Sequence, residues 1–454
     1  MFKTMIPLMQ EWENVFAQKR TAQRAIRQAI SSVCVLGNRT IARSYLLIAS
    51  TGDWSSEYKL HSRSSWEPQN LFDGALREAI RWCPDEFLAL GTDDTRIKKS
   101  GKKIQTANWG RDPLSPPFQV NLQFGLRFLH TAVLTPYDSK AGVGARALPV
   151  WFEEAPAVKK PGKKASPEQV QQYRQEKKRR NLSVQAVSMF TQMRQKVDSV
   201  GGQEKTLAFA LDGSYCNQTI FKAELERTVL IARARKDAQL CWPVSEGRRR
   251  YSVETFTPEK VLKDSGRPWS EGNVFHGGKQ RTVQYKEVNH ILWRRGSGTK
   301  LLRLIVVKPV AYRKTKAGRL LYREPAFLLT TDLLSQAERL LQIYFDRWQV
   351  EVAHRELKQT FGLGQAQVRV PSSVARQPVL TVATYSILHL AALVEFGARR
   401  AEVFGAIPKY QREKTRVSGA DLVRYLRHEV VAQPEWLPED LGITEKSILA
   451  TATL

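Results

Sequence analysis

The sequence predicts a mixed α/β protein in which an N-terminal helical domain precedes a sheet-based core with a β-rich insertion. Three observations support this fold class. Up to about Trp82, apolar residues recur every three or four positions, as in amphipathic helices. From Asp85, short apolar runs alternate with polar residues, as in strands, and after Leu334 the helical pattern returns and continues nearly to the end. A chain of 454 residues exceeds one compact domain, so we expect two or three.

These changes of pattern divide the chain into five segments. The first two are a helical domain and the first part of the core, and the next three are an inserted all-β subdomain, the second part of the core and a C-terminal helical region. Their predicted boundaries are 1–84, 85–234, 235–325, 326–400 and 401–454.

The chain is strongly basic, with 71 Lys+Arg against 44 Asp+Glu and a net charge of +27. Such an excess predicts a polyanionic partner, most often nucleic acid. A membrane-surface protein is the competing interpretation, but neither a lysine-rich amphipathic helix nor a lipidation motif is present in the sequence. The apolar run 379–394 is short for a bilayer span, so we expect a buried helix in a cytoplasmic protein.

A basic, proline-containing segment separates two of the strand-like runs. It reads "APAVKKPGKKASPEQVQQYRQEKKRR", and we expect an exposed loop followed by a helix from about Pro167. For any single lysine here, a solvated surface without function is the simpler interpretation.

Two acids follow strand-like runs. Asp93 comes after "EFLALGT" and Asp212 after "TLAFAL". If both lie at the C-terminal ends of neighbouring strands, they converge on one edge of the sheet, where their mutual repulsion is relieved by a cation such as a divalent metal ion. For each acid alone, a turn or helix-cap residue is the alternative.

The stretch "YFDRWQVEVAHRELK" places a third acid among cations. On one continuous helix, Tyr344, Arg347, Glu351 and Lys358 fall within about 60° of one another. This stripe predicts a groove in which the acid serves metal ions and the cations serve a polyanion. The alternative is that Glu351 forms ordinary i,i+4 pairs, worth about 0.2–0.5 kcal/mol each.

The spacing Y-(2)-R-(3)-E-(6)-K resembles the signature of bacterial insertion-sequence transposases, which belong to the DDE superfamily and have an RNase H-like catalytic core. The flanks "FLLTTDL" and "TFGLGQAQVR" resemble that family's usual surroundings. "ALGTDDTRIKKSGKK" resembles its first catalytic block, and "LAFALDGSYCN" resembles its second. The resemblance covers about residues 85–364.

The resemblance implies a catalytic triad of Asp93, Asp212 and Glu351 that holds two Mg²⁺ ions, with Mn²⁺ as a substitute. Asp94 is the alternative first acid. Asp93 is preferred because it keeps the Asp-x-Thr spacing to Thr95.

The same resemblance implies a DNA transposase that cleaves the inverted-repeat ends of an insertion sequence, through a hairpin, and joins the 3′-ends to target DNA. Its partners are double-stranded DNA and, when two ends are synapsed, a second copy of the chain; no membrane is involved. The implied location is the cytoplasm of a bacterium, at the nucleoid, and residues 1–84 are candidates for binding the ends. The predicted DNA-contacting residues are Tyr344, Arg347, Trp348, Lys358, Lys98, Lys99, Lys102 and Arg355.

Three other interpretations remain. A tyrosine recombinase needs His-x-x-Arg, which none of the seven histidines provides. A catalytically inactive or domesticated relative that regulates by binding DNA is the main alternative. A nuclease of the same fold that does not join ends is the third.

Overall fold

The structure is a computed structural model, which describes residues 1–48, 53–112, 115–116, 118–139, 142–244, 250–313, 318–404, 416–437 and 443–451. Residues 49–52 and 438–442, which belong to the predicted N-terminal and C-terminal helical regions, lie outside the described residues.

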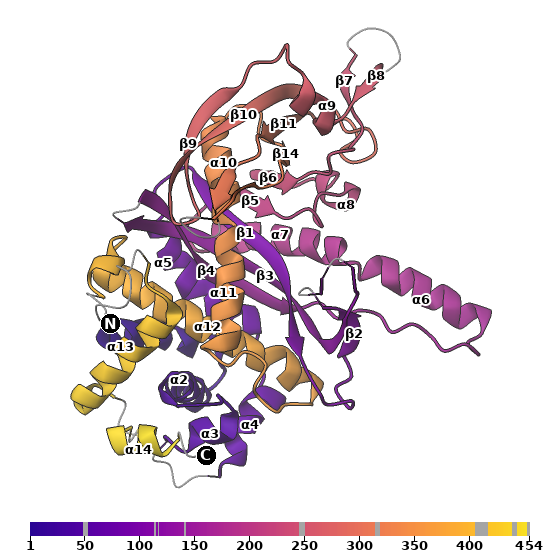
Figure 1. Ribbon diagram of the computed structural model, residues 1–454. Coiled ribbons are helices and arrows are strands. Elements are labelled where there is room, and N and C mark those ends of the chain that lie inside the picture. The colour runs from indigo at the N-terminus through magenta and orange to yellow at the C-terminus, as the bar shows by residue number, and fades with distance from the viewer. Residues whose placement is uncertain are drawn as a thin grey trace.

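The elements follow the order predicted from the sequence, with helices first, then strands, then helices (Figure 1). The N-terminal helices are α1 (Phe2–Gln10), α2 (Lys19–Cys34), α3 (Ile41–Tyr45), α4 (Ser55–Ser62) and α5 (Asp73–Arg81). The core follows with β1 (Phe87–Lys98), β2 (Asn108–Arg111), β3 (Leu122–Ser139), β4 (Gly142–Glu154), α6 (Pro167–Arg179), α7 (Leu182–Ser199), β5 (Thr206–Leu211), α8 (Gln218–Phe221) and β6 (Thr228–Arg233). Next come β7 (Leu240–Pro243), β8 (Tyr251–Phe256), α9 (Pro258–Lys263), β9 (Ser270–His276), β10 (Lys279–Ile291), β11 (Leu302–Val307), β12 (Ala311–Arg313), β13 (Leu320–Tyr322) and β14 (Ala326–Thr330). The chain continues with α10 (Ala337–Asp346), α11 (Trp348–Gln359), α12 (Pro371–Phe396), α13 (Gly419–Ala432) and α14 (Glu445–Ala450).

The main sheet is mixed, with the strand order β2-β3-β1-β5-β6-β14-β11-β10-β9 and β4 paired to β3. Strands β1, β3 and β4 form an antiparallel meander, and β5 and β6 then run parallel to β1. Helix α7 packs on one face, where the rings of Phe190 and Phe209 lie 4.2 Å apart. Helices α10 and α11 lie on the other face (Figure 1). The predicted α/β class, a mixed sheet flanked by helices, is confirmed.

The segment predicted as an all-β insertion is rich in strands, but it is neither all-β nor separate from the main sheet. Strands β9, β10 and β11 extend the main sheet through β14, while β7-β8 and β12-β13 form separate hairpins. The segment also contains the short helix α9, which the prediction missed. The hydroxyl of Thr257 caps α9 by accepting from the Lys260 N–H, and Pro258 occupies its first turn. The sequence "TPEK" carried this signal.

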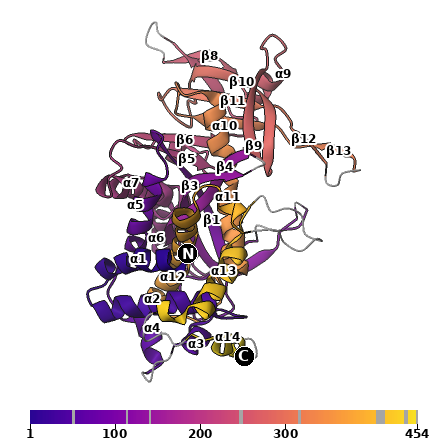
Figure 2. The same ribbon diagram turned by 90° about the vertical axis from the view of Figure 1, so that its left-hand side faces the viewer.

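The N-terminal and C-terminal helices pack together below the sheet, around α12 (Figure 2). The terminal amine of Met1 lies 3.0 Å from Glu429 on α13, and Arg427 donates to the carbonyl oxygens of Val33 and Val35. Helix α12 is long and apolar enough to cross a membrane, but 78% of its most apolar window is buried inside the protein. The prediction of a buried helix is confirmed.

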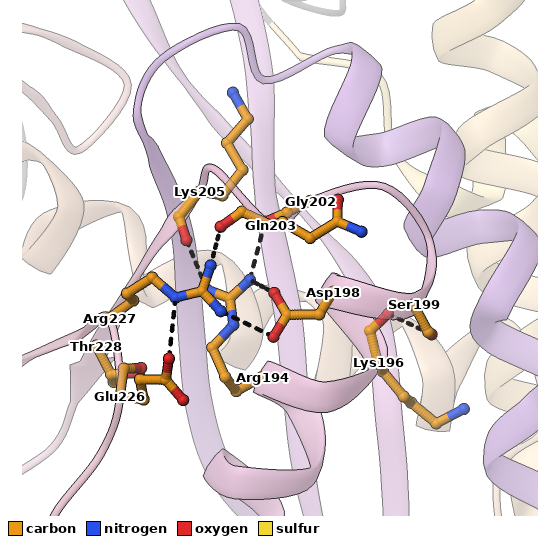
Figure 3. Close-up of polar contacts among 10 residues, drawn as sticks. All are labelled: Arg194, Lys196, Asp198, Ser199, Gly202, Gln203, Lys205, Glu226, Arg227 and Thr228. Carbon is orange, nitrogen blue, oxygen red and sulfur yellow. Dashed lines mark hydrogen bonds and ion pairs between the residues drawn. The ribbon is translucent and has the colours of Figure 1, made fainter.

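A cluster of polar contacts fixes the turn between α7 and β5 (Figure 3). The buried guanidinium of Arg194 donates to Asp198 at 2.5 Å and to the carbonyl oxygens of Lys205 and Gly202 at 2.5 and 2.8 Å. Arg227, just before β6, also donates to Asp198, at 3.0 Å. The ammonium of Lys205 donates to backbone carbonyls just before β1. One cluster therefore sets the starting points of β1, β5 and β6.

Replacing the centre of this cluster should be costly, because buried carbonyl oxygens and a carboxylate lose a charged donor. We expect Arg194→Ala to lower the free energy of unfolding by about 3 kcal/mol. The measurement is denaturant unfolding followed by circular dichroism. Arg81→Ala, which removes an exposed partner of Glu78, is the control and should change stability by less than about 0.5 kcal/mol. Equal effects of the two substitutions would contradict this role of Arg194.

Candidate active site

Two of the three predicted acids lie side by side on neighbouring parallel strands. Strands β1 and β5 pair in register up to Thr92 and Leu211, so Asp93 and Asp212 occupy the next positions of the two chains. Asp212 follows the last residue of β5, as predicted. Asp93 does not end its strand, contrary to the sequence-based expectation, because β1 continues to Lys98 through its pairing with β3.

Burial and a neighbouring charge make Asp93 difficult to ionise. Burial, followed by the charge of Asp212, raises the pKa of Asp93 to about 7, and the Arg347 guanidinium only partly offsets this rise. Oδ1 of Asp212 accepts hydrogen bonds from the N–H and the hydroxyl of Ser214, at 2.8 and 2.7 Å. Arg347 therefore compensates only part of the unfavourable charge that the two acids share.

The strand alternation separates Asp93 from its alternative, Asp94. Asp94 lies on the opposite face of β1, where it accepts from Arg127 at 2.6 and 2.9 Å and from the Tyr215 hydroxyl at 3.5 Å. A carboxylate paired with an arginine in this way is already neutralised. The geometry therefore favours Asp93 as the partner of Asp212.

Glu351, the third acid, joins the site through Arg347. The guanidinium of Arg347 lies 3.5 Å from Oδ2 of Asp93 and 3.4 Å from Oε1 of Glu351. The pKa of Glu351 is raised, first by burial and also by Asp212, while Arg347 lowers it. Each of these carboxylates is therefore influenced by the charge of Asp212.

The predicted single helix from Tyr344 to Lys358 is divided in the structure. Helix α10 ends at Asp346 and α11 begins at Trp348, with Arg347 between them in a right-handed helical conformation. The Val350 N–H donates to the Arg347 carbonyl, three residues back, so one turn is tightened. Tyr344 therefore lies on α10, and Glu351 lies in the first turn of α11.

Gly91 allows α11 to lie close to β1. It points to the same face as Asp93, two residues away, and a Cβ at this position would lie 2.7 Å from Cγ2 of Val350 and 3.5 Å from Cα of Arg347. Any side chain here would separate the helix from the strand. This glycine is a functional position that sequence reasoning missed, although "LGTD" placed it beside the acid.

Buried polar contacts anchor α11 to the sheet and to α12. Nε2 of His354 lies 2.8 Å from Nδ1 of His130 on β3, which is the register partner of Asp93. Burial lowers the pKa of His130 to about 3 and that of His354 well below its usual value, so both imidazoles are neutral at pH 7. Two residues further along α11, Glu356 forms a buried ion pair with Arg146 of β4 and accepts from the Tyr385 hydroxyl of α12 at 2.9 Å.

Two hollows flank the acids and share one arginine. A hollow of about 690 Å³ is lined by Asp212 and Arg233, and another of about 500 Å³ is lined by Arg233, Tyr344, Arg347 and Trp348. Arg233 ends β6, the strand next to β5, and lies 3.7 Å from Glu324. Sequence reasoning missed this arginine, although its position at the end of a strand-like run was the available signal.

The other predicted DNA-contacting residues are not all free to bind DNA. The ammonium of Lys99 donates to the carbonyl oxygens of Gly364 and Ala366 at 2.9 and 3.0 Å, so it supports the loop after α11, contrary to the prediction. Lys98, Lys102 and Arg355 are exposed, Trp348 is 55% exposed and Lys358 is partly buried. Lys98 ends β1, roughly 16 Å along the strand from Asp93. Lys102 lies in the turn that follows.

The residue types at this site fit divalent metal ions, because carboxylate oxygens are the preferred ligands of Mg²⁺. Burial and the charge of Asp212 raise the pKa of Asp93, so a cation bound by both acids would relieve an existing repulsion. Asp93, Asp212 and Glu351 would hold the ions. Within the described parts of the chain, no three acidic, histidine or cysteine side chains lie close enough to form a metal cage as they stand.

Comparison with known proteins gives a match to part of the chain. Residues 183–387 match the family model of the transposase DDE domain. A search of curated proteins finds no match to the chain. The matched stretch contains Asp212 and Glu351 and begins after Asp93, so the match does not bear on the choice of Asp93. The match supports a DDE transposase, a family of enzymes that act on DNA and generally use divalent metal ions.

The raised pKa of Asp93 predicts a pH-dependent change in stability. In the unfolded chain an aspartate ionises near pH 4, whereas Asp93 in the fold ionises near pH 7. Between these values the folded protein binds the additional proton, so this group lowers the stability as the pH rises. Without metal ions, Asp93→Asn should therefore raise the free energy of unfolding at pH 8, on the order of 3 kcal/mol, with little effect at pH 4.

Thermal unfolding at both pH values in EDTA measures this effect. Asp94→Asn is the matched control, because it removes the partner of Arg127 and should stabilise the protein at neither pH. A stabilised Asp94→Asn protein, or no gain from Asp93→Asn at pH 8, would contradict the proposed environment of the two acids.

The close approach at Gly91 predicts a second effect. Gly91→Ala places a Cβ against Val350 and should displace α11, at a cost of about 1–3 kcal/mol. Since Glu351 moves with the helix, DNA cleavage should fall more than DNA binding. Cleavage assays and binding titrations on the same preparation test this, and Gly162→Ala, in open space, is the control. Unchanged cleavage in a folded Gly91→Ala protein would remove Gly91 from the site.

Proposed function

We propose that this protein is an insertion-sequence transposase that binds the inverted-repeat ends of its element, cleaves them in a metal-dependent reaction and joins the 3′-ends to target DNA. The observation that carries the proposal is the convergence of Asp93, Asp212 and Glu351 on one site beside Arg347. An ordinary surface ion pair does not bring three carboxylates from three separate elements together.

The strand order supports an RNase H-like core. A meander of three antiparallel strands is followed, through α6 and α7, by two strands parallel to the first, which gives the order β4-β3-β1-β5-β6. The acids lie on the two central strands and on a helix that covers one face. That arrangement agrees with the core that the Y-R-E-K resemblance implies.

In the proposed reaction, Asp93, Asp212 and Glu351 would hold divalent metal ions, which would supply an activated water or 3′-hydroxyl and charge stabilisation for the leaving oxygen in a displacement at phosphorus. The residues of the chain orient the DNA. Tyr344, Arg347 and Trp348 line the hollow beside the acids, and Arg233 connects it with the hollow at Asp212. A phosphate entering there would draw the Arg347 guanidinium away from Asp93 and Glu351. This exchange would leave both carboxylates available as metal ligands.

The remaining parts of the proposal follow from the resemblance. They are the hairpin intermediate, a homodimer that synapses two ends, Mg²⁺ with Mn²⁺ as a substitute, and a location at the bacterial nucleoid. Binding of the ends by residues 1–84 is also part of it. A regulatory DNA-binding relative without catalysis is the alternative, and the same assay distinguishes the two.

The deciding experiment uses supercoiled plasmid that carries the gene with its natural flanks, purified protein, and Mg²⁺ or EDTA. Breaks mapped on a denaturing gel should occur at a pair of inverted repeats only with Mg²⁺, and Asp212→Asn should abolish them. Specific binding without any cut would favour the regulatory alternative. Cuts without joined products would favour a nuclease of the same fold.

Substitutions at the stripe should separate chemistry from binding. Glu351→Gln should retain DNA binding and lose cleavage by at least about a thousandfold, because a metal ligand is lost. Arg347→Ala should weaken both activities, since a phosphate contact is lost. Filter binding and the cleavage assay measure the two effects. Cleavage by the purified Glu351→Gln protein would remove Glu351 from the site.

A further inference from the structure

The basic segment singled out in the sequence forms an arm that the active site does not use. Between residues 156 and 180 it carries nine lysines and arginines against two glutamates. Its helix α6 begins at Pro167, as predicted, and none of its side chains is buried. Figure 1 shows α6 extending away from the body of the protein.

Helix α6 has little to hold it in place by itself. An isolated helix of 13 residues is marginal in water, and this one has no apolar face packed on the core. Its capping box, formed by Ser166 and Gln169, stabilises the first turn. The exposed side chains of α6 are therefore accessible to a partner.

The charges on α6 are sorted by face. At 100° per residue, Arg174, Lys177 and Lys178 fall within about 100° of one another, and Glu168 and Glu176 lie on the opposite side. Glu176 pairs with Arg179 and Arg180 at the end of the helix. The three cations of the first face are exposed, and Lys177 also lies 5.8 Å above the Tyr173 ring.

The base of the arm lies beside the candidate active site. The arm ends at Arg180, and the first turn of α7 follows directly. There the hydroxyl of Ser183 accepts from the side-chain amide of Asn217 at 2.9 Å. Asn217 belongs to the loop that Asp212 begins. A double helix lying at that loop would therefore pass the base of the arm.

We propose that the face of α6 formed by Arg174, Lys177 and Lys178 binds the sugar-phosphate backbone of duplex DNA that flanks the active site on the Asp212 side. This inference rests on the proposed function and adds a contact surface to it. The helix is about 20 Å long, which matches roughly six base pairs at 3.4 Å per base pair. Since phosphates are the ligands, the contact is independent of DNA sequence.

The chemistry of the arm favours DNA over a lipid surface. A helix that lies in a membrane interface needs a broad apolar face with residues such as Trp, Phe or Leu. On α6, Val170 and Tyr173 are the sole large apolar side chains, and charged residues and glutamines occupy the other positions after Pro167. Binding to the backbone of duplex DNA requires cations on one face of the helix and no apolar surface.

The test compares two triple variants of the full-length protein on a fluorescent 40-base-pair duplex of arbitrary sequence. Arg174→Ala/Lys177→Ala/Lys178→Ala removes the proposed face. The control, Arg399→Ala/Arg424→Ala/Lys446→Ala, removes the same charge from the exposed surface that follows α12 and from α13 and α14. Anisotropy titrations at several salt concentrations give the slope of log K against log salt, which falls by about 0.9 per phosphate contact.

We expect the arm variant to have a slope shallower by about 2–3 and an affinity at least roughly tenfold lower at 0.1 M salt. The control variant should retain the wild-type slope. Equal slopes for the two variants would overturn the proposal. An arm-dependent affinity for polyglutamate equal to that for the duplex would overturn it as well, in favour of an acidic protein partner.

A crosslinking experiment keeps the proposal testable if a triple variant folds poorly. A photo-crosslinker is attached to one of two introduced cysteines. Gln171→Cys lies next to Lys178, at the edge of the proposed face, and Gln172→Cys lies about 100° further round the helix, away from that face. Crosslinks to the duplex from position 171 and few from position 172 are expected. Equal crosslinking, or none from position 171, would overturn the proposal.

These outcomes are separate from those that test the transposase proposal. If the arm contributes to binding but wild-type protein never cuts the plasmid in Mg²⁺, the DNA surface stands and the catalytic proposal fails. If wild-type protein cuts at inverted repeats and the arm variant binds as the control does, the catalytic proposal stands and the proposal for the arm fails. A wild-type protein that binds no duplex DNA would overturn both.

Discussion

The repulsion between two carboxylates on neighbouring strands is the constraint on which the rest of this structure depends. Asp93 and Asp212 are brought together by the parallel pairing of β1 and β5. Burial and the charge of Asp212 raise the pKa of Asp93, and Arg347 offsets only part of this rise. Such a pair lowers stability at neutral pH until a cation binds. The Arg194 and Lys205 contacts, which fix where the strands begin, help to hold this unfavourable arrangement in register.

The placement of α11 follows from the same constraint. Glu351 is useful only if its helix lies close to β1, and Gly91 makes that approach possible. Two buried contacts then hold α11 in place without adding net charge near the acids. One is the neutral pair of His130 and His354, and the other is the ion pair of Glu356 with Arg146. A charged imidazole at position 354 would change the electrostatic balance of the site, whereas a neutral one positions the helix without doing so.

Local patterns predicted the elements but not their three-dimensional relations. The helix at Pro167, the strand leading to Asp212 and the buried helix around 379–394 could be read from the sequence, because capping, alternation and apolar runs act locally. The continuation of β1 past Asp93 could not, because it depends on pairing with β3, distant in sequence. Nor could the division of the Tyr344–Lys358 stretch at Arg347, whose side chain contacts Asp93 on another element. Thr257 and Pro258 did signal α9, and that local signal was overlooked.

Net charge shows that the chain suits a polyanion, but it does not show which cations are available to one. Lys99 supports a loop, Arg146 and Arg194 are buried in ion pairs or on carbonyl oxygens, and Arg127 neutralises Asp94. These residues contribute to the +27 formal charge but have little capacity to neutralise phosphates. Arginines and lysines on α6 differ, since that helix buries none of its side chains. Any affinity for DNA therefore depends on which cations the fold leaves unengaged, and α6 presents a row of them on an arm whose base lies at the loop that follows Asp212.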